Sequence, residues 1–282
     1  NADWHVTPTD TVELYSQARQ VYLFAKGFDI TQRQNYRDAA IASYAAFVRA
    51  KAAGTVGSAC RFQVCLPTPL APIQLYVESK HRRLVEPVYE AALLKELAAI
   101  VAEIPAAELC VQWDTAVEFG VLEGVFPSYL DKPFEDIVQR LVRLGESVPS
   151  GVELGYHLCY GDSGHKHFVE PADMGLLVAV ANRLADDLSR EINWIHMPVP
   201  RERDDTAYYE PLKDLQLSPD TEIFLGLIHA TDGASGAARR IDAAQNFLTD
   251  FGVATECGWG RTDPKRVSGL LDSHLRAVTS NI

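Results

Sequence analysis

Three residues of this sequence combine side chains of a type that binds soft metal ions with a spacing that could bring them together. His157 and Cys159 lie two positions apart in ELGYHLCYGD, and Cys257 ends a distant apolar run in GVATECGWGR. If residues 152–160 form a strand, His157 and Cys159 point to the same face and can bind one ion together. An imidazole and two thiolates suit zinc, and a zinc ion held by such ligands can activate a thiol or a water molecule.

The spacing of these residues argues for a catalytic metal built by a whole domain. Cys257 follows Cys159 by 98 residues (257 − 159), whereas zinc fingers and ribbons take their ligands from short, closely spaced pairs. The competing explanation is structural, because free cysteines are among the most frequently buried residues.

The composition is that of a soluble globular protein. Of the 282 residues, 47% are hydrophobic and 23% are charged, close to the globular average. No apolar run is long enough to span a membrane, and no secretory leader is visible. Five cysteines, an odd number, argue against a disulfide framework, so we expect a cytoplasmic protein. A net charge of −12 disfavours nucleic acids and anionic membranes as partners, and we expect a small-molecule substrate.

Segments with strand character alternate with helical segments along most of the chain. Such alternation is typical of a parallel sheet. We therefore expect an α/β fold, a (β/α)8 TIM barrel that forms a single domain over residues 1–282. The expected strands are 61–67, 108–114, 152–160, 192–199, 221–230 and 253–259, and the expected helices are 86–103, 134–146, 174–191, 238–251 and 264–279.

The beginning of the chain fits this barrel less well. Residues 36–54 read as a helix, while WHVTP and QVYLFAK are only weak strands. We expect residues 1–58 to form a helical or irregular N-terminal part, with the barrel incomplete or irregular at its first strands.

Polar residues gather at the C-terminal ends of five expected strands, where TIM barrels carry their active sites. Taken singly, each of them could be a hydrogen-bonded residue at a strand end. Their shared position favours a functional site. They are Asp114, His157, Cys159, His196, His229 and Cys257.

The ordered segments HLC, IHAT and ECGWGR resemble the C-terminal catalytic barrel of cobalamin-independent methionine synthase. The superfamily of that enzyme also includes uroporphyrinogen decarboxylase and zinc-dependent alkyl-thiol transferases. The resemblance extends over most of the chain. It implies that His157, Cys159 and Cys257 bind zinc (Zn2+) and that His229 transfers protons.

Two further positions can be compared with that family. Asp114 ends VQWD, and the resemblance implies that it holds the polar end of a thiol substrate. The fourth zinc ligand of the family is a glutamate at the end of the sixth strand, where this chain reads WIHMP. Either His196 replaces that glutamate, or the fourth ligand is Glu170, His165 or His167 in GHKHFVEP.

These observations predict a zinc-dependent methyl or alkyl transferase that acts through a zinc-activated thiol. Coordination to a dication deprotonates a thiol, and His229 would protonate the leaving group. The alternative is a zinc-dependent lyase or hydrolase of an aromatic or carboxylated small molecule on the same barrel. A third hypothesis is a non-catalytic barrel stabilised by its metal. The methyl or alkyl donor, the acceptor and the oligomeric state are left open.

Aromatic side chains close to the strand ends favour a flat, apolar substrate. Trp194 and Trp259 share strand parity with expected metal ligands, and Tyr160 follows the H-x-C pair. A large core residue is the competing explanation for either tryptophan. Arg201 could bind a substrate carboxylate, although a role in an exposed, mixed-charge loop is the simpler account.

Overall fold

The computed structural model describes residues 35–161, 166–259 and 262–279. Within these ranges the strands and helices alternate, and the six strands have the order β1-β2-β3-β4-β5-β6, the same as their order in the chain. The chain divides into two compact units, one formed by Asn1–Asp114 and Ser147–Leu154 and the other by Thr115–Glu146 and Gly155–Ile282.

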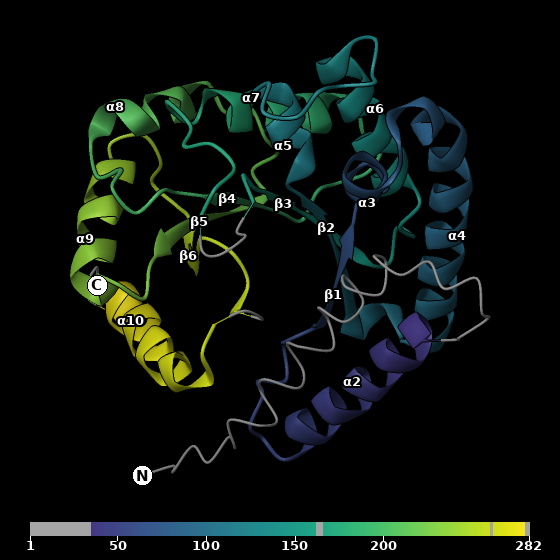
Figure 1. Ribbon diagram of the computed structural model, residues 1–282. Coiled ribbons are helices and arrows are strands. Elements are labelled where there is room, and N and C mark those ends of the chain that lie inside the picture. Colours follow the sequence, from purple (N-terminus) through teal and green to yellow (C-terminus); the bar gives the residue numbers. More distant parts are fainter. Residues whose placement is uncertain (1–34, 162–165, 260–261, 280–282) are drawn as a thin grey trace. The chain divides into compact units, whose positions relative to one another are not determined.

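The first unit contains two strands that pair in parallel. Phe62 lies opposite Leu109, and this register continues to the pair of Pro67 and Asp114. Helix α2 packs against α4 and β1 (Figure 1). The elements are α2 (Asn35–Ala52), β1 (Phe62–Pro67), α3 (Leu70–Tyr76), α4 (Arg82–Glu103) and β2 (Leu109–Thr115), whose last residue belongs to the second unit.

The second unit carries the rest of the sheet and most of the candidate site. Strands β3, β4, β5 and β6 pair in parallel, with α9 packed on β5 and α10 packed on β6 (Figure 1). The elements are α5 (Val117–Leu122), α6 (Pro133–Glu146), β3 (Glu153–Leu158), α7 (Gly175–Asp187), β4 (Trp194–Pro198), α8 (Thr206–Tyr209), β5 (Glu222–Ile228), α9 (Gly233–Ala244), β6 (Gly252–Thr255) and α10 (Val267–Thr279). The first two residues of β3 belong to the first unit.

The local sequence explains these elements. In α6 the buried residues Ile137, Leu141 and Leu144 recur every three or four positions, and acidic residues occupy the first turn, where they favour a helix. Strand β5 is a nearly continuous apolar run, as expected for a parallel strand covered on both faces. The buried side chains of these elements form the core beneath the site.

The parallel arrangement confirms the predicted α/β class. The described residues contribute six strands in an open order, so the closed eight-stranded TIM barrel is not what they form. Helix α2 matches the helix expected near the N-terminus, whereas WHVTP and QVYLFAK lie outside the described residues. The single domain and the cytoplasmic location stay predictions. In the described ranges, no helix combines the length and apolar character needed to cross a bilayer.

Candidate metal centre

The three residues that the sequence singles out come together in the second unit. His157 lies in β3, Cys159 directly follows this strand, and Cys257 follows β6. One ligand atom from each side chain lies within 4.8 Å of the other two. His157 and Cys159 are buried, with exposed fractions of 6% and 2%, and Cys257 is half-buried.

This donor set fits a zinc ion. In a tetrahedral site, bonds of about 2.3 Å to sulfur and 2.0–2.1 Å to nitrogen place neighbouring ligand atoms roughly 3.5–3.8 Å apart. The three atoms need only a small contraction to reach that spacing. Without an ion, the neighbouring Cys257 thiol and burial raise the pKa of Cys159 well above its usual range. A bound dication acts in the opposite direction, because it stabilises the thiolate.

A second imidazole lies against His157. His157 and His196 are opposite each other in the register of β3 and β4, and their rings stack with centroids 4.6 Å apart. Their Nδ1 atoms are 2.6 Å apart, so one ring donates a hydrogen bond to the other. Burial, followed by the influence of His157, holds the pKa of His196 well below its usual range, and a neutral ring can accept that bond. Among the described residues, His196 is not part of the group of three converging ligand atoms.

Trp194 lies on the same strand face as the two histidines. It is opposite Gly155, and a Cβ at that glycine would be only 1.9 Å from the indole ring. The missing side chain therefore lets the ring lie across β3. Residues i and i+2 of a strand share a face, which places half-buried Trp194 beside His196.

Trp259 and Tyr160 are held by other contacts. The Trp259 indole Nε1 donates to Thr255 Oγ1 at 2.8 Å, and its ring packs edge-on against His274 of α10 at 5.6 Å. Tyr160 is buried, and its ring lies 5.1 Å from the ring of Phe119.

Arg201 and Asp114 have local partners. Arg201 is half exposed, and its Nε pairs with Glu202 Oε1 at 2.7 Å. Asp114 belongs to the first unit, where Gln112 Nε2 donates to its Oδ1 at 2.8 Å. The substrate-binding role of Arg201 and the catalytic role of Asp114 stay predictions.

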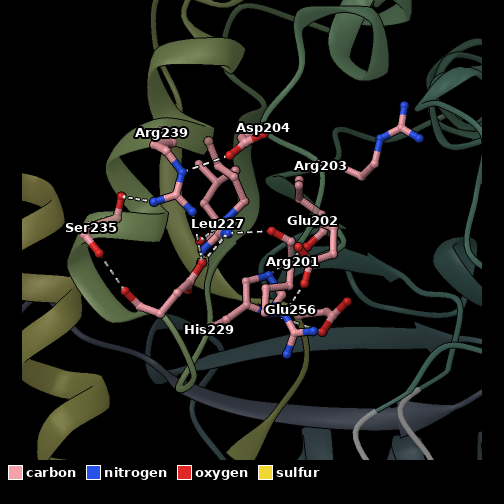
Figure 2. A network of polar contacts seen from close by, with 12 residues as sticks. Arg201, Glu202, Arg203, Asp204, Leu227, His229, Ser235, Arg239 and Glu256 are labelled. Atoms are coloured by element: carbon pink, nitrogen blue, oxygen red, sulfur yellow. Dashed lines mark hydrogen bonds and ion pairs between the residues drawn. The ribbon is translucent and has the colours of Figure 1, made fainter.

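Glu256, the residue before Cys257, links two histidines. Its Oε1 lies 2.5 Å from His167 Nε2, and its Oε2 lies 3.6 Å from His229 Nδ1. The Nε2 of buried His229 donates to the carbonyl oxygen of Val199 at 2.9 Å. Figure 2 shows His229 and Glu256 within one polar network that also contains Arg201 and Arg239. Sequence reasoning missed Glu256, and its only signal was its position beside Cys257.

The two histidines have opposite pKa shifts. Burial lowers the pKa of His229 below its usual range, although the charge of Glu256 acts against this. Burial would also lower the pKa of His167, but its contacts with Glu256 and Glu170 raise it above its usual value. Of the two histidines that contact Glu256, His229 therefore favours the neutral form and His167 favours the cation.

A fully buried arginine fixes the backbone around His229. Arg240 donates from Nε to Leu227 O at 2.8 Å and from Nη1 to Arg201 O at 2.7 Å. Its Nη1 and Nη2 atoms bind both carboxylate oxygens of Asp232 at 2.8 and 2.9 Å. Arg240 thus connects the end of β5, the loop after β4 and the residue before α9. Because His229 lies between Leu227 and Asp232 in the chain, these hydrogen bonds hold the backbone on both sides of it.

The other candidates for a fourth ligand are engaged elsewhere or lie outside the described residues. His167 Nδ1 is 3.1 Å from Glu170 Oε2, and the Glu170 side chain is 68% exposed. His165 lies outside the described residues.

Comparisons with known proteins give distant structural likenesses and no match at the level of sequence. No protein-family model matches the chain, and the curated proteins contain no match to it. Among solved structures, the chain is similar to a protein named as a candidate vitamin-B12-independent methionine synthase from Listeria monocytogenes, with 17% identity and a TM-score of 0.48. The alignment covers 78% of this chain and 63% of that one, so this chain spans less than two thirds of the length of the other protein.

Proposed function

We propose that this protein is a zinc-dependent methyl or alkyl transferase whose acceptor is a thiol. The observation that carries the proposal is the convergence of the His157, Cys159 and Cys257 ligand atoms to within 4.8 Å of one another. Catalytic zinc sites use three protein ligands and keep a fourth position for water or substrate. Two thiolates and one imidazole therefore suit a centre that accepts a substrate thiol.

Zinc, when bound, lowers the pKa of a thiol in the open position, so that the thiol can react as a thiolate at neutral pH. The protein supplies the surroundings. His157, Cys159 and Cys257 hold the ion, and the half-buried Trp194 ring offers an apolar surface beside them. His229 would take up the proton that the substrate thiol releases and give it to the leaving group, because a departing oxygen or nitrogen anion is otherwise unstable.

His196 is better suited to orient His157 than to bind the metal. Metal-binding histidines usually donate their second ring N–H to a neighbouring acceptor, which fixes the tautomer and the ring orientation. The 2.6 Å contact between the two Nδ1 atoms fits this arrangement, with neutral His196 as the acceptor. His157 would then bind the ion through Nε2.

The test begins with metal content. Purified protein is expected to contain one zinc ion per chain by plasma mass spectrometry, and Cys257→Ser should lose most of it. Cys110→Ser is the matched control, since this thiol is buried in the first unit and makes a weak bond to the Phe62 carbonyl. Equal zinc content in Cys257→Ser and the unmodified protein would refute the site.

Zinc-edge X-ray absorption then distinguishes the reaction classes. Addition of homocysteine or thiophenol should add one sulfur ligand to the two supplied by the protein. An unchanged sulfur shell would favour the alternative, a lyase or hydrolase in which the metal polarises an oxygen. A shell saturated by four protein ligands would favour a structural metal.

A further inference from the structure

Glu256 lies where it can influence the protonation of His229, the residue that acts as the acid in the proposed function. Its two carboxylate oxygens contact different rings, His167 Nε2 at 2.5 Å and His229 Nδ1 at 3.6 Å. The three residues come from different parts of the second unit: the segment after β3, the end of β5 and the segment after β6. One carboxylate thus spans elements that are distant in sequence.

The hydrogen bonds of His229 determine which nitrogen is available for proton transfer. A carbonyl oxygen can only accept, so His229 Nε2 must carry the proton that it donates to Val199 O at 2.9 Å. In the neutral ring, Nδ1 then carries a lone pair and faces Glu256. Protonation at Nδ1 would give the ring a second donor directed at a carboxylate, which stabilises the cation.

The contacts of His167 keep the other side of Glu256 fixed. Both ring nitrogens face carboxylates, Nδ1 towards Glu170 at 3.1 Å and Nε2 towards Glu256. Burial would lower the pKa of His167, but its contacts with the two carboxylates raise it above the usual value, which favours a ring protonated on both nitrogens. Only 2% of its side chain is exposed. In its protonated form this buried ring would compensate the charge of Glu256 and hold the carboxylate in place.

The backbone of Glu256 reaches this position because of a glycine in β5. A Cβ at Gly226 would lie 2.8 Å from the Cα atom of Glu256 and 3.0 Å from that of Pro198. Both neighbours are backbone atoms, which cannot move aside as a flexible side chain can. The close approach at Gly226 therefore helps to set where the carboxylate lies.

We infer that Glu256 is a positioning residue that anchors itself on His167 with one oxygen and directs His229 with the other, so that His229 carries the reacting proton on Nδ1. The inference rests on the proposed function, in which His229 gives a proton to the leaving group. Burial lowers the pKa of His229 and the charge of Glu256 raises it, while Arg240 and Asp232 act on it in opposite directions.

Long-range 1H–15N NMR of the histidine side chains tests this inference without any activity assay. The unmodified, metal-free protein should show His229 as the tautomer with the proton on Nε2. Glu256→Gln should lower the titration midpoint of His229 by about one pH unit, because it removes an opposite charge near Nδ1. Zinc content should stay at the level of the unmodified protein.

Glu170→Gln is the matched control, since it removes the other carboxylate from His167 but has no contact with His229 in the described structure. It should leave the His229 midpoint unchanged. If Glu256→Gln does not fold, Glu256→Asp retains the charge at a greater distance and should give a smaller shift in the same direction. A proton on Nδ1 of neutral His229, or equal midpoints in Glu256→Gln and the unmodified protein, would overturn the inference. Failure of zinc binding would overturn the proposed function alone.

Discussion

Replacing Arg240 by Met should destabilise the second unit strongly. The side chain is fully buried, and its guanidinium donates to the Leu227 and Arg201 carbonyls and to both oxygens of Asp232. Methionine has a similar length but no donor. The variant would therefore leave one carboxylate and two carbonyls without the donors that they have in the native structure.

The size of the expected stability loss depends on how deeply Asp232, the ion-pair partner of Arg240, is buried. Removing one member of a buried ion pair costs about 3–5 kcal/mol, because the other charge is left uncompensated. The Asp232 side chain is 22% exposed, so water can solvate part of its negative charge once Arg240 is removed. We therefore expect Arg240→Met to lower the free energy of unfolding by about 3 kcal/mol, at the lower end of that range.

Urea unfolding followed by circular dichroism measures this loss. Arg239→Met is the matched control. Its side chain is 55% exposed, pairs with Asp204 at 2.8 Å and lies 3.7 Å from Asp232, so its loss should cost much less than the loss of buried Arg240. Adding Asp232→Asn to Arg240→Met should recover part of the stability, with a coupling above about 1 kcal/mol. A loss below about 1 kcal/mol in Arg240→Met would refute the argument from buried charge.

The same pair predicts a dependence on acidity. Burial alone would raise the pKa of Asp232, but the contacts with Arg240 lower it below the ordinary 3.8. A lowered carboxyl pKa contributes stability above 3.8 that disappears as the pH falls through the lowered value. The difference in free energy of unfolding between Arg240→Met and the unmodified protein should therefore become smaller as the pH falls below 3.8 and Asp232 becomes protonated.

Three further results are expected. Gly226→Ala should cost about 1–3 kcal/mol in urea unfolding, since its new Cβ meets backbone, whereas Gly269→Ala in α10, where a Cβ meets nothing within 4 Å, should not destabilise. The raised pKa of His167 means that its ion pairs contribute stability below pH 6.5 that is lost as the pH rises through the raised value, and unfolding of His167→Gln should lack this dependence. Removing the metal with a chelator should make Cys257 reactive towards iodoacetamide, as detected by peptide mass spectrometry. Cys110, whose pKa burial raises to about 12, should stay unmodified with and without the chelator. Alkylation of Cys257 at equal rates with and without the chelator would contradict this expectation.

The fold was predictable where hydrophobic patterns are long. The strands expected over 108–114 and 192–199 correspond to β2 and β4 within two residues at either end. The helix expected over 238–251 instead begins at Gly233, in a glycine-rich stretch that reads as a loop. A Cβ at Gly236 would lie 1.8 Å from the Asp232 carboxylate, so the glycine makes room for the ion pair with Arg240. A tertiary contact decides this boundary, and local propensity does not reveal it.

The candidate metal ligands were easier to identify than their surroundings. Strand periodicity places His157 and Cys159 together, and few residue types bind soft metals, so the sequence narrows the choice. The stacking of His196 on His157 depends on the register between β3 and β4, which a single sequence does not specify. Glu256 was missed because a lone glutamate reads as a solvated charge.

The peptide bond between Glu256 and Cys257 joins two centres that do different work. Cys257 supplies its sulfur atom to the candidate metal site, and Glu256 contacts the rings of His167 and His229. A shift of this short stretch that draws the sulfur onto an ion must carry the carboxylate with it. If an ion binds to Cys257 as proposed, its binding would therefore also move Glu256, and the NMR signals of the His167 and His229 rings should change when zinc is added.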